Sequence, residues 1–259
     1  MNRLSFKTRS VALVSKVGLS LLLVVLTGLL AASCQANKAG TAKKGGKIRV
    51  LMVGGGSSHD FDRWYKQADV ATLSRDGFAT VRYTSNTDSI AEYLAAGTDV
   101  LYLVTNQNIQ DPQDRQAIQA FVDAGKGLVI GHAGMWYNWR NWPEYNRQIA
   151  GGGSRGHDRY GAYQVKVNDT QHPVMKGVEP DFTLKDERYY YIPDPAGPGV
   201  DILASSSVAG SDKIFPSVFV VKHPQARIVG LALGHDGESH DIANYQHMLR
   251  NAVAWVARK

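Results

Sequence analysis

Four short segments of the sequence place side chains that can bind metals or transfer protons beside apolar runs. Three segments directly follow an apolar run, and the fourth is LKDERYYY, residues 184–191. The residues concerned are His59, Asp60, His132, Asp186, Glu187, Tyr189, His235 and Asp236. Imidazole with carboxylate suits Zn, Ni, Fe or Mn, and both groups act as general acids and bases. The pattern indicates one polar site, provided that the fold brings the segments together.

His132 lies in GLVIGHAGMW, residues 127–136, a pattern typical of a buried strand that ends in a glycine-flanked turn. Many α/β enzymes present a nucleophile at such an elbow. Here the elbow carries His132 and Ala133, so it has neither a Cys nor a Ser nucleophile, which argues against an amidase-like hydrolase. A lone histidine at a strand end is also often a hydrogen-bonded structural residue, and this alternative stays open.

Candidates for acid–base catalysis are Asp60, Asp236 and His157, the last of which lies in a predicted loop, GGGSRGHDRY. Aromatic residues in MWYNWRNW are candidates for a wall against the apolar face of a sugar ring, or for core packing. They are Trp136, Tyr137, Trp139 and Trp142, and we expect Trp136 and Tyr189 to bind substrate. The remaining histidines are expected to be structural or to lie on the surface: His172, His223, His240 and His247.

The glycine-rich segment VGGGSSH, residues 53–59, resembles a phosphate-binding loop. It fits neither the dinucleotide-binding pattern nor the Walker pattern, so no nucleotide cofactor is expected.

The first half of the chain alternates strand and helix patterns, which must position these side chains. Strands are predicted at 47–55, 78–85, 99–106 and 127–133, and helices at 61–77, 88–97 and 111–125. The third helix has Asp111 as N-cap, Pro112 in its first turn and Gly125 beyond its end. Short apolar strands separated by helices predict an α/β fold with a parallel, doubly wound sheet, which binds ligands at the carboxyl ends of its strands.

The second half is richer in strands and predicts an antiparallel extension of the sheet. Strands are expected at 162–167, 182–192, 200–208, 217–222 and 227–234, and a last helix from about 241 to 257. The runs 217–222 and 227–234 should form an antiparallel hairpin.

The N-terminal 33 residues resemble a bacterial lipoprotein signal. Four basic residues precede an apolar run at 17–32: Arg3, Lys7, Arg9 and Lys16. This run leads into the segment AASC, residues 31–34. Cys34 is then the lipid-bearing first residue, residues 34–46 are a flexible linker, and 47–259 form one domain. An uncleaved membrane anchor is the alternative, and either places the domain outside the cytoplasm. In a Gram-negative host, Gln35 favours export to the outer membrane.

Composition excludes several functions. Cys34 is the only cysteine, so zinc–thiolate sites, intramolecular disulfides and cysteine catalysis are excluded. Eight of the 29 Lys and Arg residues precede Ile48 and none of the 23 Asp and Glu residues does, so residues 48–259 carry a formal charge of −2. A domain without a basic surplus is not expected to bind nucleic acid.

Five segments in this order resemble the trehalose-utilisation (ThuA-like) family. They are VLMVGGGSSHDF, FVDAGKGLVIGHAGMW, GGGSRGH, HPVMKGV followed by FTLKDERYYY, and RIVGLALGHD before NAVAWVAR. The resemblance covers about residues 47–259 and implies a flavodoxin-like, class I glutamine-amidotransferase-like fold without the Cys nucleophile. It also implies a metal or active site lined by His59, His132, Glu187 and His235, with His157 joining them.

The resemblance implies an enzyme of disaccharide, glycoside or 3-keto-glycoside utilisation, functionally linked to sugar oxidoreductases. The expected chemistry is metal-assisted acid–base catalysis on a small sugar substrate. A sugar-binding lipoprotein without catalytic activity is the alternative, and metal-dependent turnover distinguishes the two.

Overall fold

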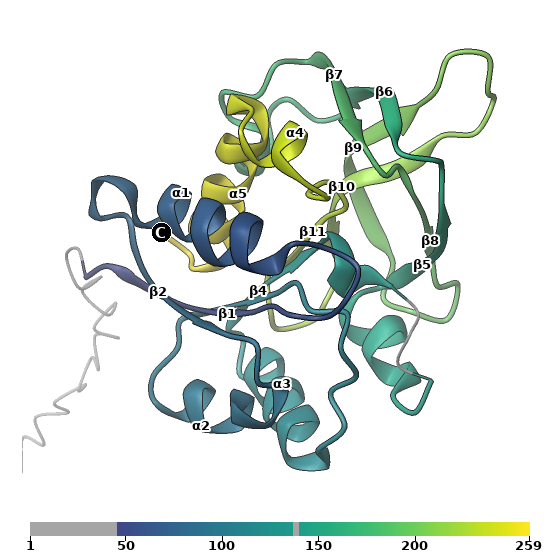
Figure 1. The fold of residues 1–259 in the computed structure, drawn as a ribbon. Helices are drawn as coiled ribbons and strands as arrows, with labels where there is room; N and C mark the ends of the chain where they lie inside the picture. The colour runs from purple at the N-terminus through teal and green to yellow at the C-terminus, as the bar shows by residue number, and fades with distance from the viewer. Residues whose placement is uncertain (1–45, 137–139) are drawn as a thin grey trace, which may run out of the picture. The chain divides into compact units, whose positions relative to one another are not determined.

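Five parallel strands form the centre of the fold (Figure 1), as shown by the computed structural model, which describes residues 46–136 and 140–259. In spatial order they are β2 (Ala79–Thr84), β1 (Ile48–Val53), β3 (Val100–Leu103), β4 (Gly127–Gly131) and β11 (Ile228–Leu231). All four neighbouring pairs are parallel, so the carboxyl ends of these strands share one edge of the sheet.

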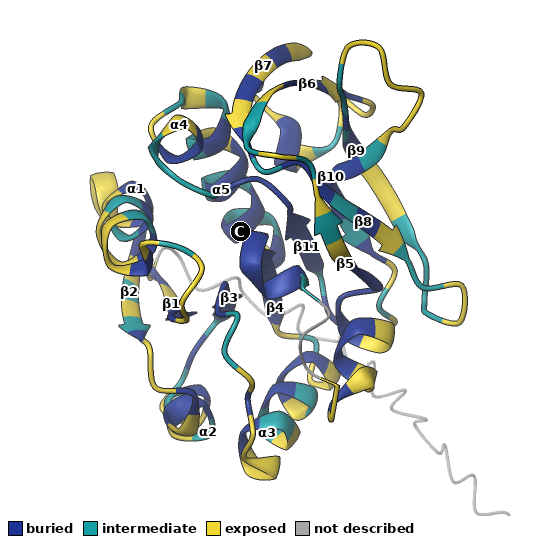
Figure 2. Ribbon diagram, turned by 45° about the vertical axis from the view of Figure 1, so that its right-hand side comes forward, coloured by how far each residue is buried: buried dark blue, intermediate teal, exposed yellow. Residues whose placement is uncertain are grey.

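Helices cover both faces of this sheet. One face carries the π-helix Asp62–Asp69, α1 (Val70–Ser74) and α5 (Ala243–Val256), and the other carries α2 (Ile90–Ala95) and α3 (Pro112–Asp123). Side chains of β1 alternate between the two faces of the sheet. Val50 and Met52 pack in one hydrophobic core cluster, and Leu51 and Val53 pack in the other. Figure 2 shows the central strands buried and the outer surfaces of the helices exposed. The predicted doubly wound sheet is confirmed.

The antiparallel extension is confirmed as well. Four strands continue the sheet from β11 in the order β10 (Phe215–Val221), β9 (Val200–Ser207), β6 (Gly161–Val167) and β7 (Asp181–Asp186). Each pairs antiparallel with its neighbour, and β10 with β11 forms the expected hairpin.

Two expectations in the second half are wrong. The single strand expected at 182–192 is two strands in different sheets, β7 and β8 (Tyr189–Pro193), because the chain turns at Glu187 and Arg188. The guanidinium of Arg188 is buried and donates to the Asp158 carboxylate and to the carbonyl of Lys213. The loop expected around His157 is strand β5 (Gly152–His157), which pairs with β8.

The helices depart from prediction mainly in their type. The segment 61–77 combines the π-helix, α1 and a 3₁₀ turn at Arg75–Gly77, and the last helix is preceded by the separate short α4 (Gly237–His240). Further short helices are Thr87–Ser89, His132–Met135, Tyr145–Ile149 and Pro173–Met175.

Several predictions concern residues outside the described ranges: the signal at 1–33, Cys34, nearly all of the linker, and Tyr137 and Trp139. Within the part of the chain that the structure describes, no helix is long and apolar enough to cross a membrane.

Candidate metal centre

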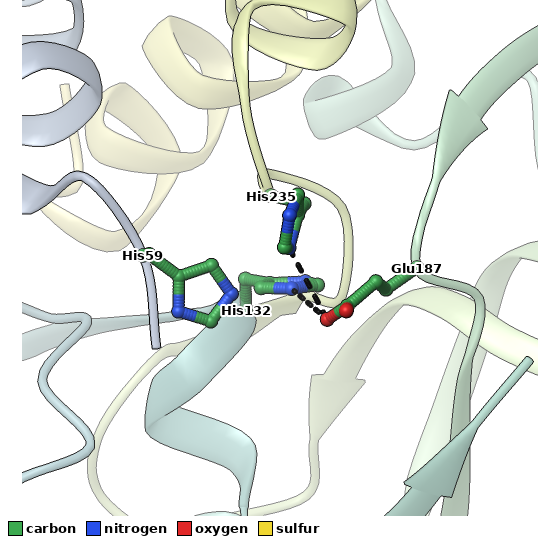
Figure 3. Close-up of side chains that lie close together, drawn as sticks. All are labelled: His59, His132, Glu187 and His235. Atoms are coloured by element: carbon green, nitrogen blue, oxygen red, sulfur yellow. Dashed lines mark ion pairs between the residues drawn. The ribbon is translucent and has the colours of Figure 1, made fainter. Parts of the chain in front are cut away.

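Three strand ends and one turn bring four side chains together (Figure 3). His59 follows β1, His132 follows β4, His235 follows β11, and Glu187 lies in the turn between β7 and β8. One ligand atom from each lies within 4.8 Å of the others. The structure therefore unites the four residues expected to bind a metal.

His132 is fixed from two sides. Its ring is fully buried and stacks on Tyr189, with ring centroids 4.0 Å apart. Its Nδ1 lies 2.7 Å from the carbonyl oxygen of Ala232. Because a carbonyl only accepts hydrogen bonds, Nδ1 carries a proton, so Nε2, which lies 3.8 Å from Glu187 Oε2, is the nitrogen that can bind a metal. This is the tautomer that a metal-binding histidine needs.

A glycine lets the elbow pack tightly. A Cβ on Gly134 would lie 2.5 Å from the carbonyl oxygen of Leu103 in β3, so a larger residue would push the His132–Met135 helix away from the sheet. The glycine-flanked turn that elsewhere presents a nucleophile here holds an imidazole close to the strand ends.

The glycine loop after β1 has a related role. Gly56 has φ +136°, and a Cβ there would collide with the Asn106 side chain. The Asn106 amide donates to the Ser58 hydroxyl, and that hydroxyl lies 2.6 Å from Nδ1 of His59. The loop therefore makes room for the side chain that orients Ser58 and, through it, His59.

The ionisation of the cluster suits a cation. Burial and the neighbouring imidazoles of His132 and His235 lower the pKa of His59 to about 2, so this ring is neutral at pH 7. Burial opposes ionisation of Glu187, but His132 and His235 hold the pKa of its carboxyl well below the usual value. The Glu187 carboxylate in turn raises the pKa of His235 against the effect of burial.

Three nitrogens of the cluster are buried and make no hydrogen bond: Nε2 of His59, Nε2 of His132 and Nδ1 of His235. The His235 atom lies 3.2 Å from Glu187 Oε2, an ion-pair distance without hydrogen-bond alignment. A buried polar atom without a partner costs about 1–3 kcal/mol, so three at one point require a shared explanation. A divalent cation bound by three imidazoles and a carboxylate satisfies all of them, and the donor set suits a transition metal.

The cluster forms part of the wall of a small cavity of about 280 Å³. The cavity is lined by Ser58, His59, Asn106, Ala133, Trp136, His157, Glu187 and Tyr189. This volume is just below the usual range for ligand pockets, about 300–1,000 Å³, and suits a group the size of one sugar ring.

A wider groove of about 920 Å³ adjoins the cavity and shares Asn106 and Trp136 with it. Its other lining residues are Gly56, Ser57, Thr87, Asp88, Gln107, Asn108 and Gln110. The groove lies beyond the carboxyl ends of β1 and β3. From β1 the chain continues to β2 on one side and then to β3 on the other, and α/β proteins commonly bind ligands at such a point in the sheet.

The three acid–base candidates differ in position. His157 lines the cavity, and its Nδ1 lies 3.8 Å from Glu187 Oε1. Asp60 and Asp236 are not among the described lining residues. The Asp60 carboxylate accepts from the Arg63 amide at 3.0 Å, and the Asp236 carboxylate accepts from Glu238 N–H and the Tyr160 hydroxyl.

The aromatic candidates also separate. Trp136 and Tyr189 line the cavity, whereas Trp142 is buried in the core with its ring 5.2 Å from that of Tyr145. Ser58 and Asn106 were not expected to line the site. Asn106 follows a strand just as the predicted ligands do, and this position was the signal that could have identified it.

Asp186 was noticed in the sequence without being given a role. Its buried carboxylate accepts from the amides of Gly234 and His235 and from the Ser239 hydroxyl. It therefore ties the strand end that carries His235 to the turn that carries Glu187.

Comparison with known proteins assigns the family. Residues 49–256 match the model of the ThuA family, described as trehalose utilisation. The chain belongs to the ThuA family. No curated protein shows significant sequence similarity to it.

Solved structures share the ThuA-like fold. A ThuA-like protein from Parabacteroides merdae is 22% identical with a TM-score of 0.68, covering 82% of this chain and 90% of that one. A ThuA-like protein from Bacteroides uniformis is 21% identical with a TM-score of 0.65, covering 84% and 94%. The glutaminase domain of Trypanosoma brucei CTPS is 11% identical with a TM-score of 0.50, covering 82% and 95%. The predicted amidotransferase-like fold is confirmed.

Proposed function

We propose that this ThuA-family protein is a metal-assisted enzyme of carbohydrate utilisation that acts on a disaccharide, a glycoside or a 3-keto-glycoside. One observation carries the proposal: three buried imidazole nitrogens without hydrogen bonds meet an ionised carboxylate beside a cavity the size of a sugar ring. The family, described as trehalose utilisation, supports a sugar as the substrate.

His59, His132, Glu187 and His235 would hold the cation. A Zn, Ni, Fe or Mn ion there would polarise a sugar carbonyl or hydroxyl, which makes the adjacent C–H more acidic. The protein itself must then exclude water, orient the sugar and accept the proton.

His157 is the acid–base group that the geometry favours. Its Nδ1 lies 2.7 Å from the carbonyl oxygen of Asp158 and therefore carries a proton, so Nε2 is the ring nitrogen that can accept a proton from the substrate. Trp136 and Tyr189 supply aromatic surfaces in the same cavity, which suit the apolar face of a sugar ring.

The polar groove offers room beyond the reacting ring. Its described lining has hydroxyl and amide side chains and one carboxylate, and it contains no Lys or Arg. This lining suits the hydroxyl groups of an uncharged sugar better than a phosphorylated one, because phosphate groups are bound mainly by cationic side chains and backbone amides.

Turnover with and without metal tests the proposal. The purified protein, analysed for bound metal, should convert oxidised or unoxidised disaccharides, lose activity in chelator and regain it with a divalent transition metal. Sugar binding with no product under any metal would instead support the binding-protein alternative. If the protein neither bound nor converted any of these sugars, a role on sugars would be refuted.

We further propose that the protein is attached through Cys34 to a membrane outside the cytoplasm, the outer membrane in a Gram-negative host. The support is the basic and apolar order of residues 1–33 and the AASC segment. Cys34→Ser should accumulate as an unprocessed precursor on an immunoblot of cell fractions. A membrane-bound mutant protein of mature size would contradict the lipid anchor.

A further inference from the structure

A buried ion pair lies beside the metal centre without belonging to it. Asp69, at the end of the π-helix, and His240, at the end of α4, are each 1% exposed. His240 Nδ1 is 2.7 Å from Asp69 Oδ1. The sequence predicted a structural or surface role for His240. Neither Asp69 nor His240 is among the described residues that line the cavity.

Both ring nitrogens of His240 face acceptors. Nδ1 faces the Asp69 carboxylate, and Nε2 lies 3.1 Å from the carbonyl oxygen of Gly234. A neutral imidazole has only one N–H and would point a lone pair at one of these acceptors. His240 is therefore a buried imidazolium that donates in two directions.

The partners of Asp69 make this buried charge tolerable. Its second oxygen, Oδ2, accepts from the Tyr102 hydroxyl at 2.9 Å and from the Tyr245 hydroxyl at 3.1 Å. A buried ion pair persists only where further hydrogen bonds satisfy its remaining atoms, and here they do. Such a satisfied network holds its atoms in one arrangement.

The network acts on the residue before a metal ligand. The Gly234 carbonyl accepts from His240 and also from the Tyr65 hydroxyl at 2.5 Å. The Gly234 N–H donates to Asp186 at 2.8 Å. Both polar groups of Gly234 are thus held, and its φ of +126° is one that residues with a side chain rarely adopt. The peptide that leads into His235 has little freedom to rotate.

We propose that the Asp69–His240 pair is a positioning device for His235: by fixing the Gly234 carbonyl, it sets the direction of the imidazole that follows. The proposal rests on the proposed metal centre. His240 contacts neither the metal nor the substrate and acts only through the peptide before His235.

Zinc affinity at a temperature well below unfolding tests this role. Asp69→Asn should bind zinc about 10–100-fold more weakly than the wild type, the effect usual for residues that orient a metal ligand. Tyr65→Phe removes the other donor to the Gly234 carbonyl and should also weaken zinc binding. It replaces Asp69→Asn as the test variant if Asp69→Asn does not fold. The matched control is Leu249→Ala in the same core cluster. It should lose melting temperature and keep zinc affinity.

A second measurement does not depend on metal. In metal-free protein labelled with ¹⁵N-histidine, the His235 ring signals should shift in Asp69→Asn and stay unchanged in Leu249→Ala, and His240 should show two protonated ring nitrogens at neutral pH. Unmoved His235 signals, or wild-type zinc affinity in Asp69→Asn, would overturn the proposal. A wild type that binds no zinc or other transition metal would refute the proposed metal centre, while the His235 signals would still decide the positioning role.

Discussion

A chelator is expected to lower the melting temperature of the wild-type protein by about 5–10 °C relative to protein with excess transition metal. A ligand at 100 times its Kd stabilises the native state by about 2.7 kcal/mol. Each kcal/mol changes the melting temperature of a domain of this size by about 2–4 °C. His59→Ala should melt close to the metal-free wild type under both conditions. The imidazole it removes has an unpaired Nε2, and the Ser58 hydroxyl keeps its bond from Asn106.

Two further variants separate metal binding from structure. His132→Ala should lose the metal response and also about 1–3 kcal/mol without metal, because the Ala232 carbonyl loses its donor. His247→Ala, an exposed histidine on α5, should keep the full metal response. If differential scanning calorimetry shows the same wild-type melting temperature with chelator and with each of Zn, Ni, Fe and Mn, the metal centre does not exist.

The parallel half of the fold was predictable because its signals are local. Apolar runs such as residues 47–55 and the caps of the 111–125 helix depend on side chains within one element, so the sequence carries them directly. The division of residues 182–192 was not predictable in this way. It depends on Arg188 reaching Asp158 and Lys213, which are 30 and 25 residues away in the chain.

The meeting of the three histidines in the candidate metal cluster was predictable for a similar reason. His59, His132 and His235 each follow an apolar strand, and parallel strands must bring their carboxyl ends to one edge. Asp60 and Asp236 also follow apolar strands in the sequence. Their carboxylates, however, accept hydrogen bonds from nearby backbone amides. His59 and Asp60 are adjacent in the sequence, and local hydrogen bonding decides which of the two side chains lines the cavity.

The positioning contacts could not be predicted at all from one sequence. Asp186 reaches Gly234 across 48 residues, and Asp69 reaches His240 across 171. A buried carboxylate and a surface carboxylate look alike in a sequence. What distinguishes them is the set of donors that the fold gathers, here hydroxyls from β3, α4 and α5 and the amide of Gly234.

His157→Gln is expected to lower kcat by about 10²–10⁴-fold, the usual contribution of a general acid or base. Glutamine keeps a polar side chain of similar length but cannot exchange a proton near neutral pH. The loss should fall on kcat, with bound metal unchanged. His157 stays in place because the next residue, Asp158, accepts hydrogen bonds from Arg188 and Tyr190.

The same assay with Asp60→Asn and Asp236→Asn decides among the three acid–base candidates of the sequence. Both of these carboxylates are held by backbone amides away from the cavity lining, so each variant should keep kcat close to wild type. Asp236→Asn should cost some stability, because the amide that replaces the carboxylate caps α4 without its charge. Full activity in His157→Gln combined with a large loss in either aspartate variant would reverse the assignment. The proton would then be moved by a carboxylate that turns toward the cavity only when substrate is bound.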